Sequence, residues 1–195
     1  MSTLNRDAEL STLSNAAYMD SPPTQIGNWV KLIPSQPSNS GFFAVAYRNP
    51  QTKQIVVAYR GTDGVSDLAA DLAFKTGAWN AQFEEAVAFT AQIRNSLLSP
   101  ANKDYSLLTT GHSLGGGISQ LMAKMFGLNG SSYDAPGANN ILNSAGYKAA
   151  AARYAPDSGQ QIGASFFNYT AQGSLISSVS SHLGNTQSLG AVNNQ

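Results

Sequence analysis

The chain has no cysteine among its 195 residues, which excludes disulfides, thiolate metal sites and a cysteine nucleophile. Charged residues make up only 11% of the sequence, against about 25% in an ordinary soluble domain. The 11 basic and 11 acidic residues cancel and form no long runs. The chain therefore lacks the basic face of a nucleic-acid-binding protein. Ser, Asn, Gln and Thr supply the polarity instead, a composition that suits a secreted or surface protein.

Long hydrophobic runs are also missing, and no apolar stretch is long enough to span a bilayer. The first ten residues lack the basic and apolar regions of a classical signal peptide. We therefore expect a soluble protein, either secreted by a non-classical route or a domain of a larger protein. The length suffices for one buried core. We expect a single domain over 1–195, with an N-terminal helix and loop at 1–40, a core at about 41–185 and a tail at 186–195.

Hydrophobic periodicity and turn residues predict strands alternating with helices. Strands are expected at 42–47, 55–59, 105–110, 131–135 and 163–169, and helices at 4–18, 80–98, 114–128 and 138–155. The first two strands read as a hairpin. Segment 21–40 carries four prolines and is expected to be mostly loop, and the tail after Ala171 shows no strong period. This order predicts an α/β fold with a mostly parallel central sheet flanked by helices.

The string TTGHSLGGG at 109–117 carries the strongest chemical signal. It contains G-x-S-x-G, follows a predicted strand and opens a predicted helix, which is the context of a nucleophile elbow. Glycines at 111 and 115 remove the side chains that would collide in so sharp a turn, and the turn lifts the Ser113 hydroxyl clear of the surface. The helix N-terminus supplies free amides, of which that of Leu114 is the first expected oxyanion donor.

A serine nucleophile needs a base, and the chain has only two histidines. His112 lies inside the elbow, where its side chain should point away from the nucleophile. His182 lies after the last predicted strand, where this class of fold places its base. Thr62 follows the strand at 55–59 and is expected to give a second oxyanion donor through its amide and hydroxyl.

Two segments, IVVAYRGTDGVSDLAADL at 55–72 and TGHSLGGG at 110–117, together resemble the class-three lipases, the fungal triacylglycerol-lipase group and its bacterial relatives. The resemblance spans about 41–185 and implies an α/β-hydrolase fold. It also implies an oxyanion hydroxyl at Thr62, a nucleophile at Ser113 and a short lid within 63–78, for which Phe74 and Trp79 are the aromatic candidates.

This resemblance implies hydrolysis of carboxylic ester bonds in lipid-like substrates by a lipase, phospholipase or esterase, through an acyl-enzyme. The reaction needs no cofactor, and no metal site is expected. The implied partners are a lipid or other ester substrate and, transiently, a membrane surface, while the oligomeric state is left open. A thioesterase or an acyltransferase would carry the same residues.

The resemblance breaks at the third member of the triad. The family places an aspartate before the histidine, and Ser174 occupies the matching position. Beyond the nucleophile the only acids are Asp134 and Asp157. Asp134, at a strand end, could reach His182 and is the preferred acid, with Asp157 less favoured. Alternatively, Ser174 orients His182 without a charge, or the chain is a catalytically impaired module that binds a lipid or protein partner.

Overall fold

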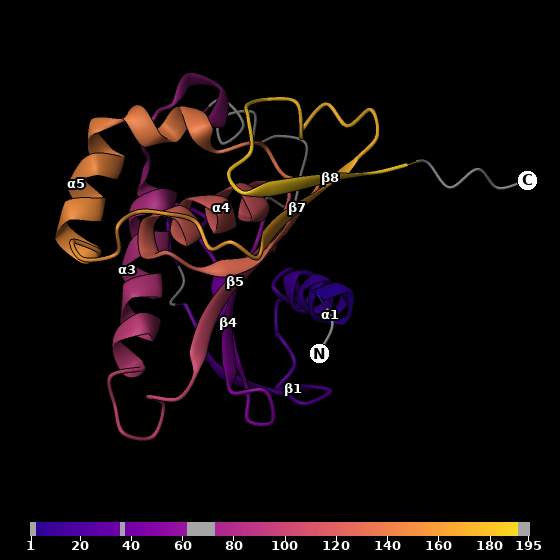
Figure 1. Ribbon diagram of the computed structural model, residues 1–195, viewed down its shortest axis with the longest axis vertical. Coiled ribbons are helices and arrows are strands. Elements are labelled where there is room, and N and C mark those ends of the chain that lie inside the picture. Colours follow the sequence, from indigo (N-terminus) through magenta and orange to yellow (C-terminus); the bar gives the residue numbers. More distant parts are fainter. Residues whose placement is uncertain (1–2, 36–37, 62–72, 191–195) are drawn as a thin grey trace, which may run out of the picture.

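The computed structural model describes residues 3–35, 38–61 and 73–190. Within these residues, eight strands form one sheet in chain order from β1 to β8 (Figure 1). Neighbouring strands are antiparallel up to β4 and parallel from β4 onward. The strands are β1 (Gln25–Ile26), β2 (Trp29–Pro34), β3 (Ala44–Asn49), β4 (Gln54–Tyr59), β5 (Ser106–His112), β6 (Asn129–Tyr133), β7 (Phe166–Ala171) and β8 (Asn185–Leu189). The helices are α1 (Thr3–Ala16), α3 (Ala81–Ser96), α4 (Leu114–Phe126), the 3₁₀ helix η1 (Asn139–Asn143) and α5 (Ala145–Tyr154).

Alternate side chains of the central strands feed two hydrophobic clusters, one on each face of the sheet. In β4, Ile55, Val57 and Tyr59 join the larger cluster, which includes residues of α3, α4 and α5. Val56 and Ala58 join the smaller cluster, which includes residues of α1. Figure 1 shows α1 on one side of the sheet and the later helices on the other. The predicted α/β-hydrolase architecture, a mostly parallel sheet between helices, is thereby confirmed.

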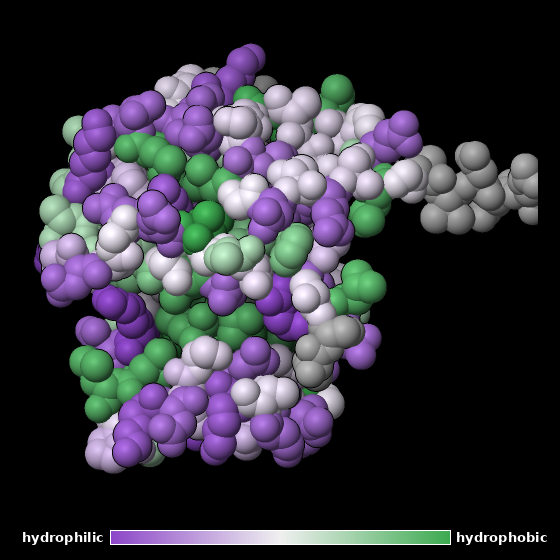
Figure 2. All heavy atoms as spheres, in the orientation of Figure 1, coloured by the Kyte–Doolittle hydropathy of each residue, from purple (hydrophilic) through white to green (hydrophobic). Residues whose placement is uncertain are grey.

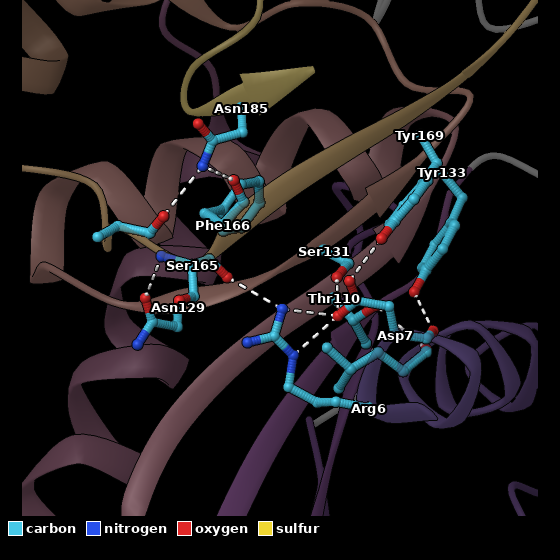
Figure 3. A network of polar contacts seen from close by, with 12 residues as sticks. Arg6, Asp7, Thr110, Asn129, Ser131, Tyr133, Ser165, Phe166, Tyr169 and Asn185 are labelled. Carbon is cyan, nitrogen blue, oxygen red and sulfur yellow. Dashed lines mark hydrogen bonds and ion pairs between the residues drawn. The ribbon is translucent and has the colours of Figure 1, made fainter. Parts of the chain in front are cut away.

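Helix α1 is fastened to the sheet by a buried polar network around Asp7, which is 4% exposed (Figure 3). The Asp7 carboxylate accepts hydrogen bonds from Arg6 Nε at 2.8 Å, Ser131 Oγ at 2.9 Å and the Tyr169 hydroxyl at 2.6 Å. The Tyr133 hydroxyl donates to the backbone carbonyl of Asp7. Burial and the Asp7 carboxylate raise the pKa of Tyr169 to about 12, so its hydroxyl stays protonated as a donor. The network ties α1 to β6 and β7.

The structure confirms the predicted hairpin, as β3 and β4, and the helix expected at 80–98, as α3. Asn80 caps α3 by accepting a hydrogen bond from the backbone N–H of Phe83 at 3.1 Å. Two segments contain strands that the sequence did not predict. The segment expected to be mostly loop contains β1 and β2, because its described prolines precede these strands or end β2 instead of interrupting them. The tail contains β8, whose five residues are all exposed and so show no apolar alternation.

The aromatic candidates for the lid belong to the core instead. Phe74 is fully buried, and its ring lies 5.3 Å from that of Phe83. Trp79 packs against Phe83 and Tyr147. Residues 73–76 are helical, and the rest of the expected lid up to residue 72 lies outside the described residues. The rings of Phe74 and Trp79 therefore pack in the core, against residues of α3 and α5.

The C-terminal part of the chain carries no Asp, Glu, Lys or Arg after Asp157. Figure 2 shows the molecule in space-filling form, in the orientation of Figure 1. The surface over β7 and β8 is mostly white, which marks residues of intermediate hydropathy. Hydrophobic side chains reach the surface in a band nearer the middle of this face. In the part of the chain that the structure describes, no helix has the length and apolarity to cross a membrane.

Candidate active site

Ser113 joins β5 to α4 in a strained conformation, with φ 52° and ψ −131°. A Cβ atom at Gly111 would collide with the carbonyl of Gly115, and one at Gly115 would collide with the carbonyl of Tyr59. The turn therefore needs glycine at both positions. Although Ser113 occupies the N-cap position of α4, its side chain makes no capping hydrogen bond. Serine usually caps at this position, so here the strained turn leaves the hydroxyl available for other chemistry.

The first expected oxyanion donor, the Leu114 amide, lies directly after this elbow. Leu114 is the first residue of α4, so its backbone N–H is one of the four that have no partner within the helix. Gly115 lies against the end of β4 at Tyr59, which brings the start of the following loop next to the elbow. Thr62, in that loop, lies outside the described residues.

His112 is turned toward Tyr18, in the segment after α1. The Tyr18 hydroxyl lies 3.0 Å from Nδ1 of His112 and donates to the His112 carbonyl at 3.1 Å. A Cβ atom at Gly61 would collide with the same hydroxyl. The Tyr18 hydroxyl therefore binds the end of β5 and lies against Gly61, which follows β4, and the His112 ring makes no hydrogen bond with Ser113.

His182 lies in the connection between β7 and β8, before the last strand and not after it as the sequence indicated. That expectation was wrong because β8 went unrecognised. The ring is half-buried. Its Nε2 lies 3.0 Å from the backbone carbonyl oxygen of Ser177. Its Nδ1 is buried and has no hydrogen-bond partner in the described part of the chain. Neither nitrogen is hydrogen-bonded to the Ser113 hydroxyl.

Of the acid candidates Asp134, Asp157 and Ser174, only Asp134 affects the pKa of His182. Burial lowers the pKa of His182, while the Ser177 carbonyl and the Asp134 carboxylate act to raise it. Asp134 follows β6 with φ 40°, and one of its carboxylate oxygens is buried without a hydrogen-bond partner among the described residues. The elbow is tied to the same strand end, because the Ser113 N–H donates to the Tyr133 carbonyl at 3.0 Å. The ends of β5 and β6 thus bring Ser113 and Asp134 into one region.

The other two acid candidates do not meet the histidine. Ser174 lies in the loop after β7, where its hydroxyl accepts a hydrogen bond from the Ser177 N–H at 3.3 Å. It therefore touches the residue that contacts His182 and not His182 itself. Asp157 is exposed after α5 and is not among the groups that shift the His182 pKa.

The segment that carries His182 packs directly on the turn that follows Asp134. A Cβ atom at Gly137 would collide with the Ser180 carbonyl. The Asn139 N–H donates to the Ser181 carbonyl at 3.2 Å. Sequence reasoning missed both this contact and the role of Ser177, since a backbone carbonyl leaves no trace in residue type. Only the small residue at 137, next to a proline, hinted at a close approach.

In the described residues, no cluster of three His, Asp or Glu side chains could hold a metal ion.

Comparison with solved structures gives the fold. A triacylglycerol lipase from Penicillium expansum matches with a TM-score of 0.65 and 14% identity, over 97% of this chain and 81% of that one. The Lip2 lipase of Yarrowia lipolytica matches with a TM-score of 0.62 and 15% identity, over 95% and 79%. The Rhizomucor miehei lipase in its propeptide complex matches with a TM-score of 0.60 and 17% identity, over 89% of this chain. The chain spans only 62% of the length of that lipase.

Comparison with curated proteins gives no match. A family model does match, over residues 8–195, and it is described as phospholipase-like, a Tle-like phospholipase domain. The matched range includes the elbow, the Asp134 turn and the His182 segment. The chain therefore belongs to the phospholipase-like family defined by the Tle-like phospholipase domain.

Proposed function

We propose that the chain is a serine hydrolase that cleaves carboxylic ester bonds in phospholipid-like substrates through an acyl-enzyme on Ser113. The observation that carries this proposal is the elbow. A serine held at φ 52° between a buried strand and a helix, without using its hydroxyl as a cap, fits no ordinary structural role. The family supports a phospholipid or related lipid ester as the substrate.

In the proposed reaction, the Ser113 oxygen attacks the acyl carbonyl while His182 takes the hydroxyl proton. The oxyanion that forms accepts hydrogen bonds from the Leu114 amide and from Thr62. The protonated ring then gives its proton to the departing alcohol, and water releases the acyl group by the same route. The charge of Asp134 stabilises the protonated ring during both steps.

His182 serves as base through Nδ1. A carbonyl can only accept a hydrogen bond, so the contact with Ser177 requires a proton on Nε2. The neutral ring then carries its lone pair on Nδ1, the nitrogen that is buried without a partner among the described residues. Substrate binding must bring this nitrogen and the Ser113 hydroxyl within hydrogen-bond distance. Catalytic hydrogen bonds commonly tighten only in the substrate complex.

The surroundings of His182 suit a lipid–water interface. Leu175, in the same β7–β8 connection, is 85% exposed. No Asp, Glu, Lys or Arg follows Asp157, so this surface opposes neither zwitterionic nor anionic lipid by charge. We propose that the connection touches the membrane transiently during hydrolysis.

A second candidate is a catalytically impaired module that binds a lipid or protein partner. Two observations favour it: the serine at the family's acid position, and the contact of His182 with Ser177 instead of Ser113. A fluorophosphonate probe separates the two candidates, because only an activated serine reacts rapidly with it.

The experiment compares the chain with its Ser113→Ala variant on chromogenic esters of graded acyl length and on phospholipid vesicles. We expect ester cleavage by the parent chain alone, with fluorophosphonate labelling at Ser113. Equal rates for the two proteins on every substrate would overturn the assignment of Ser113. Labelling without hydrolysis, but with acyl transfer to an added thiol or alcohol, would indicate a transferase.

A further inference from the structure

Leu183, the residue next to His182, is held at both of its backbone polar groups by buried side-chain amides. The Leu183 N–H donates to Oε1 of Gln120 at 3.0 Å. The Leu183 carbonyl accepts from Nδ2 of Asn168 at 2.7 Å. The connection from residue 172 to 184 contains neither helix nor strand. These two bonds therefore fix the backbone beside the proposed base where regular structure does not.

Gln120 joins all three segments of the proposed site. It lies in α4, the helix that begins directly after Ser113, and its side chain is fully buried. While Oε1 accepts from Leu183, Nε2 donates to the Pro136 carbonyl at 3.0 Å, two residues after Asp134. One amide thus uses both its donor and its acceptor to connect the nucleophile helix, the turn after Asp134 and the His182 segment.

Asn168 makes the matching connection from the sheet. It lies in β7 and is also fully buried. Its Oδ1 accepts from the Ser132 hydroxyl at 2.7 Å, two residues before Asp134. Its Nδ2 donates to the Leu183 carbonyl and, at 3.1 Å, to the carbonyl of Asn185 at the start of β8. Asn168 therefore bridges β6, which leads to Asp134, and the segment that carries His182.

A buried amide is costly unless its polar atoms are paired, and these two amides are paired with backbone groups of the segments after Asp134 and His182. Both amides bond to backbone groups outside the helix or strand that carries them. What both share is the link between the residues around Asp134 and the residue after His182. On this basis we propose that Gln120 and Asn168 are positioning residues that set the His182 ring relative to Asp134 and Ser113. The inference rests on the proposed function.

The test replaces Gln120 with Met, which matches its length but cannot form either hydrogen bond. The matched control is Asn49→Ala. Asn49 is 1% exposed and its amide oxygen also holds two backbone groups, the N–H of Gln51 and that of Thr52. It is the last residue of β3, at the opposite end of the sheet from the elbow. Both variants lose two hydrogen bonds to backbone groups, so comparable losses of thermal stability are expected.

Three measurements are made on each folded protein: kcat and KM for an ester, the rate of fluorophosphonate labelling at Ser113, and the pKa of His182 by NMR. Misplacing a catalytic group by about 1 Å costs as much as 100-fold in rate. We expect Gln120→Met to lower kcat and the labelling rate at least about tenfold, with KM changed less than about twofold. We also expect the His182 pKa to move toward its usual value of about 6.5 as the ring loses burial.

The control should keep the parent values for all three measurements. A Gln120→Met protein that is folded and has parent-like kcat and His182 pKa would overturn the inference, as would equal defects in Asn49→Ala. If Gln120→Met does not fold, Asn168→Leu replaces it, because leucine is close to asparagine in shape but cannot donate to the Leu183 and Asn185 carbonyls. We then expect a loss of labelling rate and a pKa shift in the same direction, and parent values would again overturn the inference.

The failure of the proposed function is separable from this result. If the parent chain neither hydrolyses esters nor reacts at Ser113, the serine hydrolase proposal fails. The NMR pKa of His182 still reports whether Gln120 positions the ring.

Discussion

The Nε2 atom of His182 lies 3.0 Å from the carbonyl oxygen of Ser177. This relationship sets the tautomer of the ring, because the carbonyl accepts and Nε2 must donate. It also holds the ring in a half-buried place, where burial lowers its pKa despite the opposing effects of the carbonyl and of Asp134.

We predict a His182 pKa below the usual value of about 6.5, measured by NMR titration of the ring protons. The chain has only two histidines, and His112→Gln assigns the signals.

The activity of the parent chain should follow the same group. The base must be neutral, so kcat/KM should fall on the acid side through a pKa below about 6.5. The free energy of unfolding depends on pH in the same direction as the activity. A histidine with a lowered pKa in the folded state contributes stability above its unfolded pKa, and this stability is lost as the pH falls through the folded pKa. A His182 pKa above that of a histidine in the unfolded chain would contradict this account.

The second prediction separates the two candidates for the triad acid. Asp134→Asn removes the one carboxylate among the described residues whose charge raises the pKa of His182, so it should lower the ring's pKa further. Because the protonated ring loses its stabilising charge, kcat should fall about 100-fold or more. Ser174→Ala removes a hydroxyl that contacts Ser177 and not the ring, so kcat should change less than about threefold. Steady-state kinetics and the NMR titration check both variants.

The reverse result would be equally informative. If Ser174→Ala abolishes activity while Asp134→Asn is unaffected, the serine at the family's acid position orients His182. Asp134 would then be only the residue that terminates β6.

The third prediction concerns the contact between the Asp134 turn and the His182 segment. A methyl group at Gly137 would collide with the Ser180 carbonyl, so Gly137→Ala must push the two segments apart. We expect a loss of stability of about 1–3 kcal/mol and a loss of kcat of at least about tenfold. Thermal unfolding and ester hydrolysis measure the two effects. Gly190→Ala is the matched control, because a Cβ there has no neighbour within 4 Å and should be neutral. Full activity in a stable Gly137→Ala protein would show that this contact does not position the base.

The elbow could be predicted from sequence because its constraints are local. Gly111, Ser113 and Gly115 stand within five residues of one another, and the strand and helix on either side each have a clear hydrophobic pattern. The hairpin and α3 were predictable for the same reason. By contrast, β8 is an exposed edge strand of polar residues, and its only signal is the backbone pairing with β7.

The surroundings of His182 were not predictable because long-range backbone contacts build them. Ser177 acts through its carbonyl, and Gln120 and Asn168 act on peptide groups. Such roles place little demand on the residue types around them. A glutamine within a largely apolar helix and an asparagine within an aromatic strand were the available signals. Either would read equally well as a surface position until the fold shows that both are buried.

The final prediction concerns the network that fastens α1 to the sheet. Asp7→Ala removes the acceptor for Arg6, Ser131 and Tyr169 at once. The arginine side chain is 13% exposed and the aspartate 4%, so solvent cannot fully replace what is lost. Removing one partner of a buried pair leaves the other groups uncompensated, so we expect a loss of about 3 kcal/mol of unfolding free energy, measured by urea denaturation.

Asp7→Asn should lose less, because its amide oxygen still accepts from the hydroxyl donors. Asp104→Ala removes an exposed acid and should change stability by less than about 0.5 kcal/mol. Because α1 packs on β5 and β6, the strands that lead to Ser113 and Asp134, the Asp7→Ala protein should also lose activity at temperatures well below its midpoint of unfolding. A protein destabilised by this amount but fully active would show that α1 supports the fold without supporting the site.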